Sequence, residues 1–243
     1  ALFIREYLHQ REAVPIPHPG DQTKGGYTEV FFTGVTGPVV YADVESLYPS
    51  IMLNYDIQPA RDTLKLFPRL LKALTSLRLD TKQEMNTTAD LQLRLSLDAS
   101  QISYMFFIYS FFGYLGFAYA AFNDVSEADR VASIGQDILL QMIELLREAG
   151  GQVIEVDTDG VFFVPPDEVR GDAEERAFVE RLNHHMPPGI RVGFDGRFAR
   201  MLSYKKKNYA LLDHNGKLKL KGSSLVSRSI EPFGRRFIKE AIR

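Results

Sequence analysis

The sequence contains no cysteine, and its 243 residues include only 5 histidines. Without cysteine the chain can form neither a disulfide nor a thiolate metal site, although this absence does not identify a cellular compartment. His18 and the pair His184–His185 lie beside prolines and lack the spacing of a zinc site. These absences exclude a disulfide-stabilised fold and a zinc centre built from cysteine and histidine.

A hydrophobic run long enough to cross a membrane is also missing. The nearest candidate, residues 102–122, is rich in aromatic residues but is interrupted by Ser110, Gly113 and Gly116, which favours a packed helix followed by a turn. No signal peptide is recognisable, and the start at Ala1 indicates a fragment of a longer chain. We therefore expect no membrane partner.

The net charge of −2 conceals two parts of opposite charge. Residues 191–243 carry 14 lysines and arginines against 4 acids, whereas residues 1–190 carry 15 against 27. Such blocks suggest an acidic metal centre beside a strip that binds phosphates. For the expected helix at 230–243, the alternative is that its basic side chains simply face water.

Two acidic signatures, far apart in sequence, each follow an apolar run rich in β-branched residues. Residues 37–43 predict a buried strand with Asp43 at its tip, and residues 152–164 predict a hairpin with Asp157 and Asp159 around its turn. If these strands are neighbours in one sheet, Asp43 and Asp159 converge. Carboxylates brought together repel unless cations neutralise them, and Mg²⁺ is the natural candidate. Two such ions can hold the attacking and leaving oxygens of a phosphoryl transfer.

The remaining pattern predicts an α+β fold with an antiparallel sheet. Helices are expected at 2–10, 47–53, 66–84, 91–112, 126–149, 174–182 and 230–243, and further strands at 29–33, 203–212 and 217–223. The strand at 29–33 is expected to pair with the one at 38–43, and the last two strands to form a hairpin over His214-Asn-Gly216. Ser126 and Asp129 predict a capping box. The pairs Phe31–Phe32 and Phe106–Phe107 are expected in the core.

Four motifs, in order along the chain, resemble those of the family B DNA polymerases. The segments are Asp43-Val-Glu-Ser-Leu-Tyr-Pro-Ser50 (motif A), Tyr109-Ser-Phe-Phe-Gly-Tyr-Leu-Gly116 (motif B), Asp157-Thr-Asp159 (motif C) and Lys206-Lys-Asn-Tyr209 (the Lys-Lys-Arg-Tyr motif). Asp-Thr-Asp-Gly alone would be a weak signal, because it also suits an acidic turn or a calcium loop. The resemblance implies a palm whose antiparallel sheet packs on helices, formed by 1–60 and 113–243, and short helical-hairpin fingers at 61–112. A thumb and an exonuclease are expected to be absent.

The resemblance also implies roles for the acids. Asp43 and Asp159 would bridge two Mg²⁺ ions, with Mn²⁺ as a substitute, and the carbonyl of Val44 would complete the metal on the nucleotide side. Asp157 would be the accessory catalytic carboxylate. The alternative is that these are solvated acids at the ends of strands.

Further positions are expected to contact the substrates. Tyr48 resembles the family's steric gate against ribonucleotides, and Arg78 and Lys82, four residues apart on one helix face, match two cations that contact the triphosphate. The expected nucleotide-binding residues are Ser46, Leu47, Tyr48, Arg78, Lys82 and Tyr109. The expected DNA-binding residues are Lys206, Lys207, Tyr209, Lys221 and Arg228, with Lys219 beside them. An exposed basic hairpin without a partner is the alternative for this strip.

Several positions depart from the family's pattern. Met105 stands where motif B has a lysine that contacts the triphosphate, and Tyr109 stands where it has asparagine. Gln136 and Asn208 each replace an arginine. The acids are retained while these contacts to nucleotide and template are lost, which suggests a divergent, PolB2-like prokaryotic branch and a weak or specialised enzyme.

The sequence therefore predicts a DNA-directed DNA polymerase of replication or repair, located in the cytoplasm at the nucleoid. Its expected partners are primer–template DNA, deoxynucleoside triphosphates and separate subunits that supply a thumb or an exonuclease. One rival is a catalytically inert, polymerase-like module that binds DNA or another subunit. A second rival is a two-metal nuclease that uses the same acids, although no nuclease motif supports it.

Overall fold

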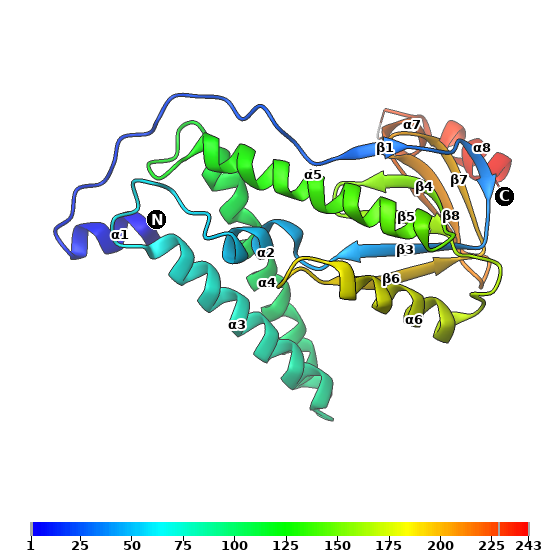
Figure 1. The fold of residues 1–243 in the computed structure, drawn as a ribbon, viewed down its shortest axis with the longest axis horizontal. Coiled ribbons are helices and arrows are strands. Elements are labelled where there is room, and N and C mark those ends of the chain that lie inside the picture. The colour runs from blue at the N-terminus through cyan, green and yellow to red at the C-terminus, as the bar shows by residue number, and fades with distance from the viewer. Residues whose placement is uncertain (1, 228, 243) are drawn as a thin grey trace. The chain divides into compact units, whose positions relative to one another are not determined.

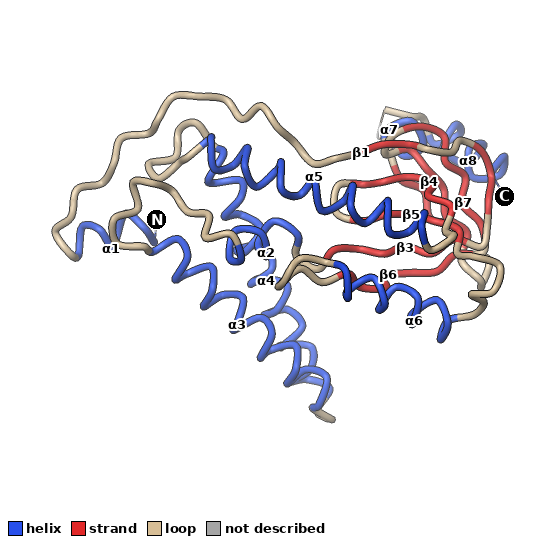
Figure 2. The backbone as a smooth tube through the Cα atoms, in the orientation of Figure 1, coloured by secondary structure: helices blue, strands red, loops and turns tan. Residues whose placement is uncertain are grey.

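The computed structural model describes residues 2–227 and 229–242 (Figure 1). Within these ranges the chain forms two compact units. The first, here the helical unit, comprises the described residues of 1–25 and 46–134, and the second, the sheet unit, those of 26–45 and 135–243. All the described strands belong to the sheet unit (Figure 2). The expected limits of palm and fingers stay a prediction.

The helical unit contains α1 (Leu2–His9), α2 (Leu47–Asn54), α3 (Leu66–Thr87), α4 (Leu91–Gly116) and the first part of α5 (Val125–Glu148). Tyr7, Leu66 and Phe122 are buried together at its core. The Tyr7 hydroxyl donates a 2.7 Å hydrogen bond to buried Asp62, which also accepts from the backbone N–H of Phe67 at 2.6 Å. This carboxylate therefore ties α1 to the start of α3.

The sheet unit is built from two antiparallel sheets. The first has five strands in the order β1 (Thr28–Val30), β4 (Gln152–Asp157), β5 (Gly160–Val164), β3 (Val39–Val44) and β6 (Val192–Phe198). The second has four, in the order β2 (Gly34–Thr36), β7 (Arg200–Lys205), β8 (Asn208–Leu212) and β9 (Leu218–Lys221). The described helices that follow are α6 (Asp172–Leu182), the short 3₁₀ helix Asn183–His185, α7 (Ser223–Val226) and α8 (Pro232–Ile242).

The two sheets share a core. Val39, Ile154 and Phe162 of the five-stranded sheet are buried against Met201, Tyr209 and Leu211 of the four-stranded sheet. Because side chains alternate along a strand, Phe163 points to the other face, where its ring lies 5.7 Å from that of Phe178 in α6. The five-stranded sheet thus has a sheet on one face and a helix on the other, which confirms the α+β fold with a sheet packed on helices.

Two strand predictions were wrong. The strand near Glu29 pairs with β4 and not with β3, whose neighbours are β5 and β6. The expected strand at 203–212 is two strands, β7 and β8, because the chain reverses at Lys206 and Lys207, and Lys207 has a left-handed φ of 59°.

The predicted capping box was also wrong. Helix α5 begins at Val125, and the carboxylate of Asp124 accepts hydrogen bonds from the backbone N–H of Glu127 and the hydroxyl of Ser126. The cap is therefore Asp124, one position before the helix, while Ser126 lies inside its first turn.

Three phenylalanines expected in the core are exposed. Phe106 and Phe107 are 67% and 57% exposed, because only one side of α4 packs, through Ile108 and Phe111. Phe31 is 39% exposed and lies under the guanidinium of Arg147. None of the helices in the described part of the chain has the length and hydrophobicity needed to cross a bilayer.

Candidate active site

The backbone brings Asp43 and Asp159 together within the sheet unit. Asp43 is the penultimate residue of β3 and pairs with Gly160, the first residue of β5. The N–H of Val44 donates to the carbonyl of Asp159 at 2.8 Å. The residues Thr158 and Asp159 form the short turn between β4 and β5, with Thr158 at a left-handed φ of 72°. Strands β3 and β5 are therefore neighbours in one sheet, which was the condition for Asp43 and Asp159 to lie close together.

The electrostatics of this pair favour a cation. Burial and the negative charge of Asp159 raise the pKa of Asp43 to about 7. Burial and the charge of Asp157 raise the pKa of Asp159 above its ordinary value. In each case the surroundings penalise the ionised form, and a divalent cation would remove that penalty. Two partly buried carboxylates supply oxygen donors of the kind that Mg²⁺ prefers, so these residues fit the ion.

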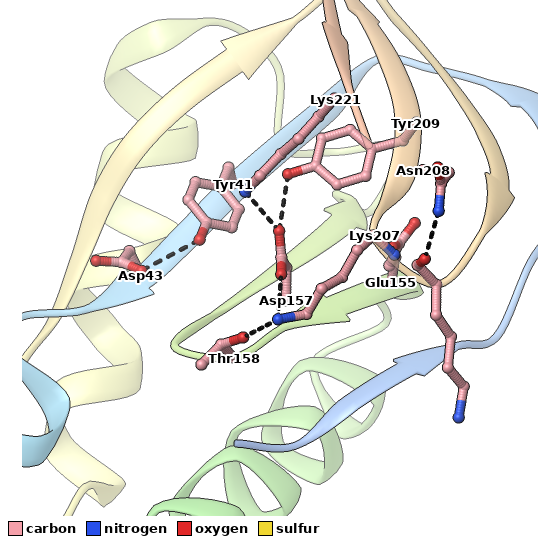
Figure 3. Close-up of polar contacts among 10 residues, drawn as sticks. Tyr41, Asp43, Glu155, Asp157, Thr158, Lys207, Asn208, Tyr209 and Lys221 are labelled. Atoms are coloured by element: carbon pink, nitrogen blue, oxygen red, sulfur yellow. Dashed lines mark hydrogen bonds and ion pairs between the residues drawn. The ribbon is translucent and has the colours of Figure 1, made fainter. Parts of the chain in front are cut away.

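Asp157 has different surroundings (Figure 3). Its carboxylate accepts hydrogen bonds from the ammonium of Lys221 at 2.6 Å and from the hydroxyl of Tyr209 at 3.0 Å, and the ammonium of Lys207 lies 3.7 Å away. Burial raises the pKa of Asp157, but the hydrogen bond and charge of Lys221 outweigh it and leave the pKa below its usual range. Asp157 is thus already neutralised by cations. Among the described residues, no three acidic or histidine side chains gather closely enough to hold a metal ion.

Tyr41 is a member of this site that the sequence did not indicate. Its hydroxyl donates to Asp43 at 3.2 Å, and its ring stacks on Phe162 with a centroid separation of 4.3 Å. A Cβ at Gly160 would lie about 2.5 Å from the tyrosine ring, so only glycine admits this ring beside the turn. Burial and the charges of Asp43 and Asp159 raise the pKa of Tyr41, which therefore remains a hydrogen-bond donor.

Two further acids lie near the site: Asp195, which the sequence did not indicate, and Glu155, which the sequence places near the site in a structural role. Asp195 lies at a β-bulge where β6 pairs with β3, and its charge adds to the raised pKa of Asp43. Glu155 is fully buried in β4, and its position next to an irregularity in the β4–β5 pairing turns it towards the four-stranded sheet. Bulges re-aim side chains in this way, and neither bulge has a signal in the sequence pattern.

The basic strip lies on β8, β9 and the turn before β8. The ammonium of Lys206 donates to Glu29 at 2.9 Å, and that of Lys207 donates to the hydroxyl of Thr158 at 2.9 Å. Tyr209 is buried in the core between the sheets, so its hydroxyl is the part that reaches the acidic turn. Lys219 and Lys221 are both exposed on β9. Arg228 lies outside the described residues.

The expected nucleotide contacts lie in the helical unit. Ser46 precedes α2 with a left-handed φ of 51°, and its hydroxyl accepts a 3.2 Å hydrogen bond from Arg78. The Nε of Arg78 is buried and has no hydrogen-bond partner among the residues described. Lys82, one turn further along α3, is exposed.

The aromatic members of the same set come from α2 and α4. The ring of Tyr48 packs on that of Phe112, with centroids 4.2 Å apart, while Leu47 is buried. Tyr109 is 42% exposed on α4, and Met105 is half-buried on the same helix. All the residues expected to bind the nucleotide therefore lie in the helical unit.

A match to the family description "DNA polymerase family B" covers residues 58–243, and the chain belongs to that family. It is 28% identical over 228 residues to DNA polymerase 1 of Pyrococcus abyssi, an alignment that covers 84% of this chain and 30% of the relative. It is 29% identical over 230 residues to a DNA polymerase of Pyrococcus glycovorans, covering 84% of this chain and 29% of the relative. The chain therefore spans less than a third of the length of these relatives.

The fold has a match among solved structures. The family B DNA polymerase from the archaeon Pyrobaculum calidifontis superposes with a TM-score of 0.68 and 22% identity, over 100% of this chain and 36% of that one. At this identity the likeness concerns the fold alone. That the chain is a region of the family B DNA polymerases rests on the family match over residues 58–243.

Proposed function

We propose that this region carries out template-directed DNA synthesis by nucleotidyl transfer with Mg²⁺, for which Mn²⁺ is a substitute. The observation that carries the proposal is the pairing of Asp43 with the turn that bears Asp159. Burial raises the pKa of both carboxyl groups, and it is raised further by the charge of Asp159 on Asp43 and by the charge of Asp157 on Asp159. Such a pair is unfavourable without a cation, and two-metal phosphoryl transfer is the chemistry that such carboxylates support.

In this proposal each residue has a defined task. Asp43, Asp159 and the carbonyl of Val44 hold the ions, which when bound would activate the primer hydroxyl and neutralise the triphosphate. Tyr41 holds the Asp43 carboxylate in place through its hydroxyl. Asp157 acts as the accessory acid while it remains bonded to Lys221 and Tyr209.

Substrate binding is proposed for the positions that match the family's motifs. Ser46, Leu47, Tyr48, Arg78, Lys82 and Tyr109 would contact the deoxynucleoside triphosphate, with Tyr48 excluding the ribose hydroxyl. Lys206, Lys207, Tyr209, Lys221 and Arg228 would bind primer–template DNA. Residues 1–60 and 113–243 would be the palm and 61–112 the fingers, with separate subunits supplying a thumb or an exonuclease.

We propose further that the activity is weak or specialised. Met105 can neither carry a charge nor give a proton to the leaving pyrophosphate. Loss of a general acid typically costs on the order of 10²–10⁴ in rate. The retained acids would support the remaining catalysis.

Primer extension tests the proposal. The wild-type chain with Mg²⁺ is expected to extend a primer only with the templated nucleotide, and Asp159→Asn is expected to lower the rate by at least about 10³, since it removes a metal-bridging charge. Asp167→Asn, an acid whose side chain is fully exposed in the same unit, is the matched control and should extend at the wild-type rate. Extension that survives Asp159→Asn would overturn the proposal.

The inert module remains the second candidate because of Asp157. Its carboxylate is occupied by Lys221 and Tyr209, so only Asp43 and Asp159 are left for metal binding. Duplex binding without extension or cleavage by the wild-type chain would favour this candidate. Cleavage of the primer without synthesis would instead identify a nuclease.

A further inference from the structure

Glu155 and Asn208 hold the two ends of one peptide group. The backbone N–H of Lys207 donates to Oε1 of Glu155 at 2.8 Å, and the carbonyl of Lys206 accepts from the side-chain amide of Asn208 at 2.8 Å. This N–H and this carbonyl belong to the same peptide bond, the one between the two lysines. Its plane is therefore fixed by two side chains that are 0% and 7% exposed (Figure 3).

Both side chains are themselves held by further hydrogen bonds. Burying a carboxylate is costly unless it is hydrogen-bonded, and the second oxygen of Glu155 accepts from the Ser203 hydroxyl at 2.9 Å. Its contacts therefore join β4 of the five-stranded sheet to β7 and the turn of the four-stranded sheet. The side chain of Asn208 is held by Ser224, whose backbone N–H donates to Oδ1 of Asn208 at 2.8 Å.

The turn needs such support because of its conformation. Lys207 adopts a left-handed φ of 59°, which is uncommon for a residue other than glycine, asparagine or aspartate. With its peptide held, Lys206 reaches Glu29 on one side and Lys207 reaches Thr158 and Asp157 on the other. The orientation of this one peptide thus sets the direction in which both lysine side chains leave the backbone.

We propose that Glu155 and Asn208 are positioning residues that fix the two lysines of this turn for contact with the backbone phosphates of duplex DNA beside the Asp157–Asp159 turn. The inference rests on the proposed DNA-binding function and assigns to it two buried residues that touch neither DNA nor metal. It also gives a structural reason for asparagine at position 208, where the Lys-Lys-Arg-Tyr pattern has arginine. The short amide of Asn208 can turn back to the carbonyl of Lys206, two residues earlier.

The test is a double-mutant cycle read by duplex binding. Glu155→Ala is expected to raise the dissociation constant for a primer–template duplex roughly tenfold and to reduce the salt slope of binding by about 1 to 2, since each phosphate contact contributes about 0.9. In a Lys206→Ala/Lys207→Ala background the same substitution should have almost no further effect. Additive effects in the two backgrounds would overturn the inference, because Glu155 would then act independently of the lysines.

Three further variants separate positioning from stability. Glu155→Gln keeps an acceptor for the Lys207 N–H and should bind duplex as the wild type does. Glu175→Ala removes another buried carboxylate of the sheet unit, one bonded to Arg197, and should destabilise the fold without changing the salt slope. If Glu155→Ala does not fold, Asn208→Ala carries the same cycle. Equal losses of binding in Glu155→Ala and Glu175→Ala would contradict a positioning role.

The outcomes also separate this inference from the proposed function. A wild-type chain that binds duplex but extends no primer would remove the proposed synthesis, and the cycle would still decide the role of Glu155. A wild-type chain that binds no duplex would overturn both.

Discussion

At the scale of single residues, the acids around one turn have opposite electrostatic conditions. Lys221 and Lys207 hold the pKa of Asp157 below its usual range, whereas burial and neighbouring acids raise the pKa values of Asp43 and Asp159. Asp43 and Asp159 therefore need a cation, whereas Lys221 and Lys207 already neutralise Asp157. This division agrees with the proposed metal-binding role of Asp43 and Asp159, and it links the accessory acid Asp157 to the basic strip.

The raised pKa of Asp43 predicts a stability effect that does not depend on catalysis. The folded state keeps a proton on Asp43 up to a pH of about 7, whereas the unfolded chain loses it near 3.8. The ionised carboxylate therefore opposes folding above about pH 7, and this penalty disappears as the pH falls towards 4. Asp43→Asn should raise the free energy of unfolding of the metal-free chain at pH 8 by on the order of 2 kcal/mol, allowing for solvent screening, and much less at pH 5.

Thermal unfolding at the two pH values, with and without Mg²⁺, checks this expectation. Mg²⁺ should stabilise the wild type, because a ligand that binds only the folded state raises its stability, and should have little effect on Asp43→Asn. Asp167→Asn serves again as the exposed control. An Asp43→Asn chain that melts at a lower temperature than the wild type at pH 8 without metal would show that the ionised Asp43 carboxylate does not destabilise the fold.

The sequence left the pairing of β3 with β5 as a condition. The acids themselves could be predicted, because each signature follows an apolar run rich in β-branched residues. Their partners could not. Tyr41 follows the side-chain alternation of any strand residue, so the sequence does not distinguish it. Its ring reaches Asp43 only because residue 160, the pairing partner of Asp43, is a glycine without a Cβ. Glu155 is an acid inside an apolar run, and its partners Ser203 and Lys207 lie about fifty residues away in another sheet.

At the scale of elements, the turn between β7 and β8 explains why one long strand was predicted. Lys206 and Lys207 carry no glycine or proline signal, and the left-handed residue is held by side chains from distant segments. Long-range hydrogen bonds here override local preference. The same limit applies to α4, where residues 104–109 are all apolar or aromatic, so periodicity could not show that Phe106 and Phe107 would be exposed.

Helix α4 carries the departure with the clearest functional consequence. Met105 is half-buried there, at the position that a lysine occupies in motif B. Met105→Lys should lower the KM for the incoming nucleotide about 5- to 30-fold, since a charge-assisted hydrogen bond contributes about 1–2 kcal/mol. Single-nucleotide insertion kinetics measure this change.

The control is Ser103→Lys, which adds the same charge to an exposed position of α4 two residues earlier, on a different face of the helix. An equal gain in both variants would indicate a general attraction for the triphosphate. No gain from Met105→Lys would remove the alignment of motif B on which the expectation depends.

At the scale of the whole molecule, the fold class and the family follow from the order of the motifs. The sequence does not show which of the basic segments lies beside the acidic site. The part of the chain with excess positive charge contains both the lysines of β9 and the preceding turn and the exposed arginines of α8. Composition counts these cations equally. The structure separates them, because the lysines of the turn are held beside the acidic site by Glu29 and Thr158 and those of α8 belong to a helix with no buried residue.

This separation predicts different salt dependences of duplex binding. If Lys206, Lys207, Lys219 and Lys221 contact phosphates, the logarithm of the binding constant should fall with the logarithm of salt concentration with a slope of about −3 to −4. Lys206→Ala/Lys219→Ala should reduce that slope by about 2, while Arg235→Ala/Arg236→Ala, which removes the same charge from α8, should change it by less than about 0.5. Titrations of a primer–template duplex between low and physiological salt measure all three slopes. Equal reductions from the two double variants would mean that α8 also lies on DNA, and an unchanged slope for the lysine variant would leave the strip as a solvated hairpin.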